Sequence, residues 1–127
     1  MNVLIVENGC GLGTIWADHV GRLGCDVVLV HCQVDAEAQL REQDFDVLVV
    51  NLNLNPRWGD ASAIADYANF RRPTAKVVCV TTSSFFSDGS IFRYMPNACV
   101  MVPPSTEPED LAALVEYHAR AEQRIAV

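Results

Sequence analysis

The chain has 127 residues, of which half are apolar and a fifth are charged, a composition typical of one soluble domain with a single core. Its net charge of −7, with no run of Lys and Arg to offset it, argues against direct binding of nucleic acid. The apolar stretches are far shorter than the ~20 residues of a membrane helix, so we expect no membrane contact. No signal-peptide pattern precedes the first apolar run, which predicts a cytoplasmic location.

The first half of the chain alternates short apolar runs with segments of helical spacing. Residues 3–6 form a continuous apolar run, typical of a parallel strand that is covered on both faces. The next segment predicts a helix that stops at Gly24, a residue suited to a helix C-cap. Strands are then expected at residues 25–30 and 47–50, and between them a helix that Asp35 caps.

The second half repeats this alternation after a loop at residues 51–59. A helix that follows the loop is expected to end before Pro73, because proline disfavours helical geometry in the preceding residue. The remaining expected elements are strands at residues 77–80 and 99–102, a short helix at 88–95, and a last helix that starts with Thr106 and Glu109 in capping-box spacing.

Five strands that alternate with five helices predict one domain over residues 1–127, a doubly wound α/β fold with helices on both faces of a parallel sheet. Right-handed crossovers bring the carboxyl ends of the strands to one edge, where ligands bind in open α/β sheets. The residues expected at this edge are Glu7, Asn8, His31, Cys32, Asn51, Thr81, Thr82, Pro103 and Pro104. Any chemistry of the chain should therefore lie there.

Several stretches together resemble the response regulator receiver domain of two-component signalling, the CheY-like superfamily, over essentially the whole chain. They are residues 3–8, 46–54 and 78–81, with weaker support from Gly59–Asp60, Pro104 and residues 108–111. The resemblance implies a flavodoxin-like sheet of strand order 2-1-3-4-5. It also implies a pocket where an Asp is phosphorylated beside Mg²⁺, with a Thr or Ser of strand four and a Lys of strand five on the phosphoryl group.

The residues at the matching positions depart from that pattern. The acidic pair is Glu7–Asn8, and the phosphoacceptor position is Asn51, whose amide cannot form an acyl phosphate. The strand-five lysine is absent, because Lys76 is the only lysine of the chain and precedes strand four; residues 102–104 fill its place with Val-Pro-Pro. The sequence therefore predicts an atypical receiver domain that is not phosphorylated on Asp and is not an enzyme.

The remaining polar groups of this pocket offer little to a cation. Glu7 alone keeps a formal charge where three carboxylates would hold Mg²⁺, so we expect at most a weak residual contact through Glu7 and no cofactor. Thr81 keeps the hydroxyl position of the family. The hydroxyls of residues 81–84 are equally compatible with a strand end that satisfies its own polar groups.

Signalling without phosphorylation requires contact with another protein, such as a sensor kinase or another regulator, and a homodimer is also compatible with the sequence. In the family the output surface corresponds to residues 88–95, 99–102 and 111–118. The candidate contact residues are Trp58, Phe85, Phe86, Ile91, Tyr94, Val100 and Met101. The three loop aromatics among them, at positions 58, 85 and 86, either meet a partner or fold back to fill the pocket.

An alternative function is a small-molecule-binding, nucleotide-binding or redox module on the same flavodoxin-like sheet. Residues 9–13 resemble a phosphate-binding glycine turn, although their pattern is GxGxG and not GxGxxG. Cys10, His31 and Cys32 would lie near one another at the same edge, where a metal or redox site is conceivable. Their spacing matches no known ligand pattern, and the five cysteines include no CxxC pair.

Overall fold

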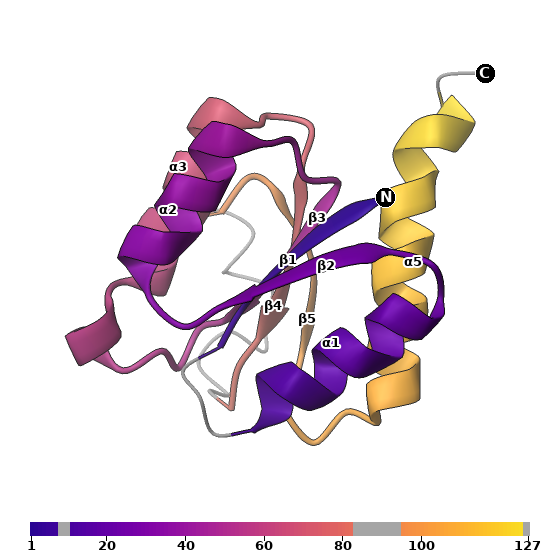
Figure 1. Cartoon of the computed structure of the whole chain (residues 1–127), viewed down its shortest axis with the longest axis horizontal. Helices are drawn as coiled ribbons and strands as arrows, with labels where there is room; N and C mark the ends of the chain where they lie inside the picture. Colours follow the sequence, from indigo (N-terminus) through magenta and orange to yellow (C-terminus); the bar gives the residue numbers. More distant parts are fainter. Residues whose placement is uncertain (8–10, 83–94, 126–127) are drawn as a thin grey trace.

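One five-stranded parallel sheet organises the chain in a computed structural model that describes residues 1–7, 11–82 and 95–125 (Figure 1). The strands are β1 (Asn2–Val6), β2 (Asp26–Val30), β3 (Val47–Asn51), β4 (Lys76–Val80) and β5 (Ala98–Val102). The helices are α1 (Leu12–Arg22), α2 (Gln33–Glu42), α3 (Ala61–Arg71) and α5 (Pro108–Ile125), with a short 3₁₀ helix η1 (Pro56–Trp58). The order β2-β1-β3-β4-β5 confirms the expected doubly wound fold.

Helices cover both faces of this sheet, so the molecule has three layers. Figure 1 shows α2 and α3 on one side of the strands and α1 and α5 on the other. Successive strand residues point to opposite faces, so Leu4 belongs to the core beside α2 and α3, whereas Ile5 belongs to the core beside α1 and α5. The central strand β3 is buried along its whole length, which explains its unbroken apolar run.

The helix caps follow the expected pattern in part. Asp60 precedes α3 and its carboxylate accepts the N–H of Ser62 at 2.9 Å, as expected of a cap. The prediction that Asp35 caps α2 is wrong, because α2 begins at Gln33 and its N-cap residue is Cys32. Asp35 lies inside the first turn instead, where a carboxylate still interacts favourably with the helix dipole.

The start of α5 also differs from the expected capping box. Its first helical residue is Pro108, a position that proline favours because no helical partner is needed for its nitrogen. Thr106 therefore lies before the helix, and its hydroxyl donates to the carbonyl of Pro103 at 2.7 Å. The short helix expected at residues 88–95 lies outside the described residues, apart from Met95, which is buried.

Candidate functional site

The carboxyl ends of the strands gather polar residues, as the sequence predicts. Glu7 directly follows β1, Asn51 ends β3, and Thr81 directly follows β4. Backbone hydrogen bonds join neighbouring strands at this edge, for example from the N–H of Thr81 to the carbonyl of Val102 at 3.0 Å. Within the described ranges, these three are the buried polar residues of the molecule. We call this place the candidate site.

The side chain of Asn51 turns the chain as it leaves the central strand. Its amide oxygen accepts the backbone N–H of Asn53 at 2.9 Å, and its carbonyl accepts the N–H of Leu54 at 3.2 Å. Such a bond from a side chain to the backbone two residues on is an Asx turn, which asparagine forms readily. The position therefore holds a neutral amide that already serves the loop as a hydrogen-bond acceptor.

A second asparagine connects the exits of β3 and β4. The amide oxygen of Asn53 accepts the backbone N–H of Thr82 at 2.8 Å and its hydroxyl at 3.3 Å. We call this pair of bonds the Asn53 bridge. The bridge was not predicted, although asparagines at positions 51, 53 and 55 gave a signal: alternate polar residues after a buried strand indicate side chains that satisfy the backbone of a turn.

Glu7 is fixed against the beginning of α1. Its carboxylate accepts the N–H of Gly13 at 3.0 Å, and only 1% of the residue is exposed. The N–H groups at a helix N-terminus and the helix dipole both favour a negative charge there. The glycine makes this approach possible, because a Cβ at position 13 would lie 2.9 Å from the Cβ of Glu7 and 2.9 Å from Leu29.

His31 contacts the backbone of the same residue. Its Nδ1 lies 2.7 Å from the carbonyl oxygen of Glu7, so this nitrogen carries the proton and donates. Of the other members of the proposed thiol and imidazole cluster, Cys32 is the N-cap residue of α2, and Cys10 lies outside the described residues. In the part of the chain that the structure describes, no three His, Cys, Asp or Glu side chains are grouped as metal ligands would be.

The donor groups of the candidate site do not suit a hard divalent cation. Mg²⁺ requires near-octahedral oxygen ligands and is usually held by carboxylates. Among the described residues the site offers the single carboxylate of Glu7, which already accepts the N–H of Gly13, and the neutral amide of Asn51. Asn8, the second residue of the expected acidic pair, lies outside the described residues.

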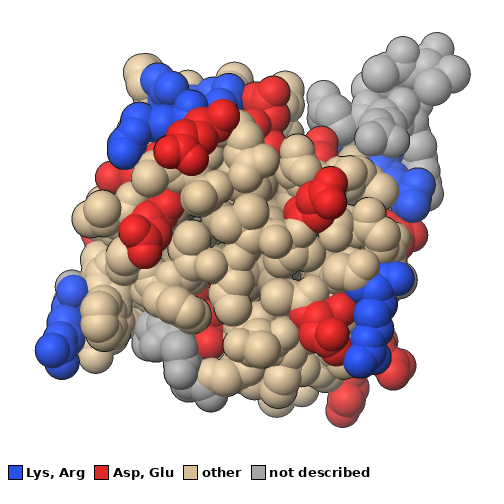
Figure 2. Space-filling model, in the orientation of Figure 1, with Lys and Arg blue, Asp and Glu red and all other residues tan. Residues whose placement is uncertain are grey.

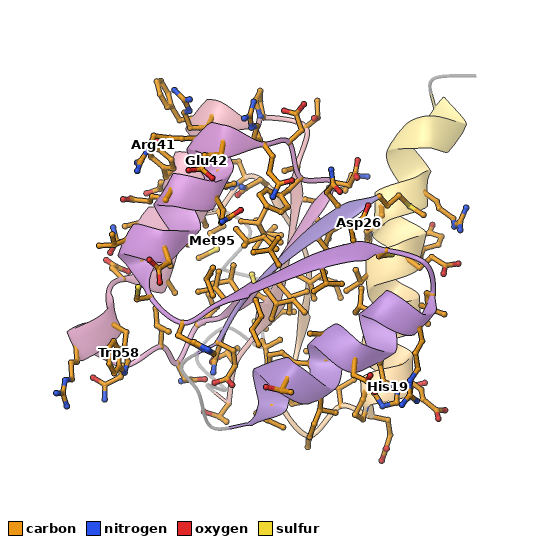
Figure 3. The ribbon with its side chains drawn as sticks, viewed as in Figure 1. His19, Asp26, Arg41, Glu42, Trp58 and Met95 are labelled. Atoms are coloured by element: carbon orange, nitrogen blue, oxygen red, sulfur yellow. The ribbon has the colours of Figure 1, made fainter. Side chains whose placement is uncertain are left out.

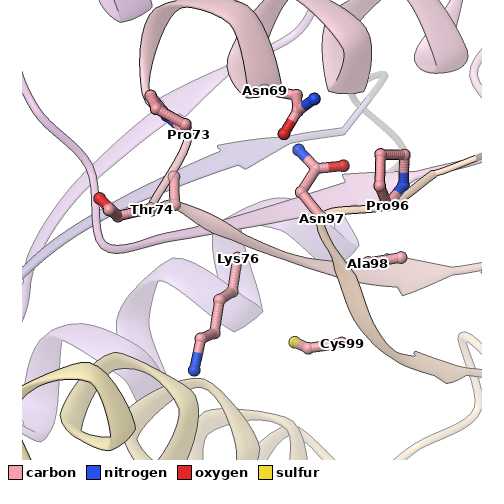
Figure 4. Close-up of a pocket in the computed structure, with 9 residues that line it drawn as sticks. Asn69, Pro73, Thr74, Lys76, Pro96, Asn97, Ala98 and Cys99 are labelled. Carbon is pink, nitrogen blue, oxygen red and sulfur yellow. The ribbon is translucent and has the colours of Figure 1, made fainter. Parts of the chain in front are cut away.

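The only lysine of the chain lies at the amino ends of the strands, away from the candidate site. Lys76 is the first residue of β4, and it lines a cavity of about 370 Å³ with Asn97 and Cys99 (Figure 4). At the candidate site β5 ends at Val102, and Pro103–Pro104 follow it, as expected. The site therefore has no lysine to bind a phosphoryl group.

The loop between β3 and α3 carries an exposed aromatic residue. Trp58 lies on η1, which projects from the body of the molecule, and 44% of the residue is exposed (Figure 3). The guanidinium of Arg57 lies 5.5 Å from the centre of its ring. A side chain with this exposure is not buried in the candidate site. The loop is anchored where Gln33 accepts the N–H of Asp60 at 2.9 Å.

The remaining candidate contact residues divide into two groups. Val100 and Met101 are half-buried on β5 and pack against opposite cores, Val100 beside α1 and α5 and Met101 beside α2 and α3. The other four lie outside the described residues: Phe85, Phe86, Ile91 and Tyr94.

The thiols within the strands behave as apolar core groups. Cys79 is fully buried, and burial raises its pKa to about 12. Burial likewise raises the pKa of Cys99 to about 11, and its thiol lies 3.4 Å from the carbonyl oxygen of Val77. Both remain protonated at neutral pH, so neither suits a thiolate ligand or nucleophile. No helix within the described ranges is long and apolar enough to cross a membrane.

Comparisons with known proteins match the chain to solved structures. No family model and no curated protein matches it. A CheY-like response regulator receiver domain protein from Methanospirillum hungatei JF-1 is 16% identical and has a TM-score of 0.83 over 97% of this chain and 96% of that chain. The N-terminal domain of a response regulator/sensory box/GGDEF three-domain protein from Carboxydothermus hydrogenoformans is 17% identical, with a TM-score of 0.81 over 100% of both chains.

A response regulator from Burkholderia pseudomallei, solved with a phosphorylated aspartic acid, a calcium ion and citrate, is 16% identical. Its TM-score is 0.78 over 99% of this chain and 72% of that chain. Identities this low concern the fold and leave the chemistry of each site to its own residues. The strand order, the helices on both faces and these matches agree, and the chain has the fold of the CheY-like response regulator receiver domains.

Proposed function

We propose that this chain is an atypical receiver domain that acts in signal transduction through protein contacts, without phosphorylation of an aspartate. The observation that carries the proposal is Asn51, a neutral amide at the carboxyl end of the central strand whose oxygen accepts the N–H of Asn53. Phosphorylation of a receiver requires a carboxylate that attacks the phosphoryl donor as a charged nucleophile. Asn51 has no such oxygen.

The surroundings of Asn51 support the same proposal. A phosphorylated site must hold several added negative charges, which lysine and a divalent cation ordinarily balance. Here Pro103 follows the last strand, and the one carboxylate at the described part of the site, that of Glu7, is directed at the N–H of Gly13. Among the described residues, an added phosphoryl group would therefore meet the negative charge of Glu7 and no lysine.

The Asn53 bridge joins the exits of β3 and β4 beside Thr81, the residue at the hydroxyl position. It holds Thr82, the second residue after β4, through two hydrogen bonds that require no bound anion. A ligand shifts a conformational equilibrium only if it binds one state better than another. With this exit held inside the chain, the domain presents one constitutive shape, and its signal depends on the amount of its partner.

The partner is a protein, either a sensor kinase or another regulator. Exposed tryptophan and arginine residues are enriched at the energetic centres of protein interfaces, and the Trp58–Arg57 pair on η1 has this composition. We therefore include η1 in the contact surface. A pull-down with the wild-type chain and with Trp58→Ala tests this part: recovery of a signalling protein by the first and its loss with the second are expected.

Intact-mass analysis after incubation with acetyl phosphate and Mg²⁺ tests the proposal itself. We expect no adduct of ~80 Da, the mass of one phosphoryl group, on the native chain, while an active receiver domain treated in parallel gains one. A stable adduct of this mass on the wild-type chain would refute the proposal. Asn51→Asp measures how far residue 51 alone limits the reaction, and we expect at most a partial adduct because Pro103 and Pro104 still stand where a lysine would be.

The alternative of a nucleotide-binding or redox module has less support from the site. The N–H of Gly13, which a phosphate-binding turn would direct at its ligand, is directed at the carboxylate of Glu7. A phosphate at this helix end would therefore be repelled. Differential scanning fluorimetry with nucleotides checks this point, and we expect no change of melting temperature.

A further inference from the structure

The strand β2 lies at one edge of the sheet, and half of its backbone groups face away from β1. The N–H of Asp26 donates to Met1 at 2.8 Å, and the carbonyl of Val30 accepts from Glu7 at 3.1 Å. In a parallel ladder the residues that bond to one neighbour alternate with those that face the other side. Val28 therefore also bonds to β1, while the N–H and C=O groups of Val27 and Leu29 point outward.

No described residue hydrogen-bonds to these outward groups across the edge. Unpaired strand edges attract other strands, and proteins usually protect them with bulges, prolines or charged side chains. The opposite edge has two of these devices, because the pairing of β4 with β5 shifts register between Val77 and Val78, and Pro103–Pro104 follow the strand. The ladder of β2 is regular, and the strand contains no proline, lysine or arginine.

The surface around β2 is uncharged in its middle. In the view of Figure 1, β2 lies in front of the other strands, and Figure 2 shows the same face with its charged side chains mostly around the rim. The three central residues of the strand, Val27, Val28 and Leu29, are half-buried and apolar. The one charged residue of β2 is Asp26, at its beginning. The edge therefore offers both backbone hydrogen bonds and apolar contact.

We propose that β2 pairs antiparallel with β2 of a second copy of this chain, about a two-fold axis at Val28, which joins two five-stranded sheets into one. In this register Val27 of one copy lies opposite Leu29 of the second copy, so outward N–H and C=O groups meet and form hydrogen-bonded pairs. Val28 faces its own symmetry mate. This inference does not depend on the proposed function.

The two-fold register keeps the like charges of the two β2 strands apart. Like charges directly opposite each other destabilise strand pairs. The two-fold register places each Asp26 opposite Val30 of the second copy, so the two carboxylates lie at opposite ends of the paired strands. The apolar middle of one strand then covers the apolar middle of the other.

Light scattering coupled to size-exclusion chromatography, on the full chain, tests the assembly. We expect a mass of twice the 14.0 kDa of one chain. Amide hydrogen exchange, followed residue by residue, tests the surface: Val27 and Leu29 should be as protected as Val28, which bonds to β1 in either case. A single-chain mass with rapid exchange at Val27 and Leu29 would overturn the proposal and leave this edge to an extended peptide of another protein.

Charge substitutions at the axis test the register. Val28→Glu and Val28→Lys each place two like charges opposite each other, so each variant alone should associate at least about tenfold more weakly. An equimolar mixture of the two should recover the doubled mass, because unlike charges then meet. Thermal unfolding followed by circular dichroism shows that each variant is folded.

Phe70→Lys, at a residue that is 79% exposed on α3, is the control and should leave the doubled mass unchanged. Dimers of both Val28 variants, or a mixture of them that stays monomeric, would contradict the register.

Discussion

Replacing Gly13 by alanine tests how Glu7 packs against α1. The added Cβ would lie 2.9 Å from carbon atoms of Glu7 and Leu29, well inside the ~3.5–4.0 Å that carbon atoms prefer. Overpacking of this kind costs about 1–3 kcal/mol, and the better helix propensity of alanine returns about 1 kcal/mol at most. Gly21 is the matched control in the same helix, because a Cβ there meets nothing within 4 Å.

We therefore expect Gly21→Ala to raise the free energy of unfolding by about 0.5–1 kcal/mol and Gly13→Ala to lie about 1–3 kcal/mol below it. Urea unfolding followed by circular dichroism measures both values on the same chain by linear extrapolation. If the two variants differ by less than about 0.5 kcal/mol, the close contact between Glu7 and α1 does not exist.

Two further predictions concern the Asn53 bridge and the buried thiols. Asn53→Ala removes both bonds to Thr82 and should lower the free energy of unfolding by about 0.5–1.5 kcal/mol and speed amide exchange at Thr82. Asn55→Ala loses one bond, within its own turn, and should cost less. Because burial raises the pKa of Cys79 to about 12 and of Cys99 to about 11, the unfolded chain ionises these thiols first, near 9.0. The free energy of unfolding should therefore fall as the pH rises from 9 towards 12, a loss that Cys79→Ala and Cys99→Ala together should reduce; a flat profile would contradict their burial.

The layered fold could be predicted from the sequence because its signals are local and repeated. The run at residues 47–50 is apolar at every position, as a strand covered on both faces requires, and the structure buries all of it. Leu111 and Val115 recur at helical spacing, and both are buried on the face of α5 that packs against the sheet. The carboxyl-edge position of Glu7, Asn51 and Thr81 then follows from the handedness of the crossovers.

The starts of α2 and α5 were predicted wrongly, because several weak signals compete to set the first residue of a helix. Asp35 and Thr106 are both suited to cap a helix, but Cys32 and Pro108 lie where the chain actually enters α2 and α5. A helix boundary depends on how the preceding strand and loop approach the core, and a short sequence window contains little of that information.

The hydrogen bonds of the candidate site could not be predicted for a related reason. Glu7 and Gly13 are six residues apart, and Asn53 and Thr82 are 29 residues apart, so their contacts depend on the finished sheet. The sequence showed which residues reach the edge. A hydrogen bond between two of these residues forms or fails with differences of a few tenths of an ångström in their separation. Spacing along the chain does not set such differences.

Nuclear magnetic resonance of the ¹⁵N-labelled chain with Mg²⁺ and beryllofluoride, an analogue of a phosphoryl group, shows whether the candidate site responds to a phosphoryl group. We expect unchanged amide signals at Asn51, Asn53, Thr81 and Thr82, because the site has no carboxylate acceptor at residue 51 and the Asn53 bridge already holds the exit of β4. Saturable shifts of these four signals on the wild-type chain would contradict this expectation, since they would show a site that binds the phosphoryl analogue and responds to it.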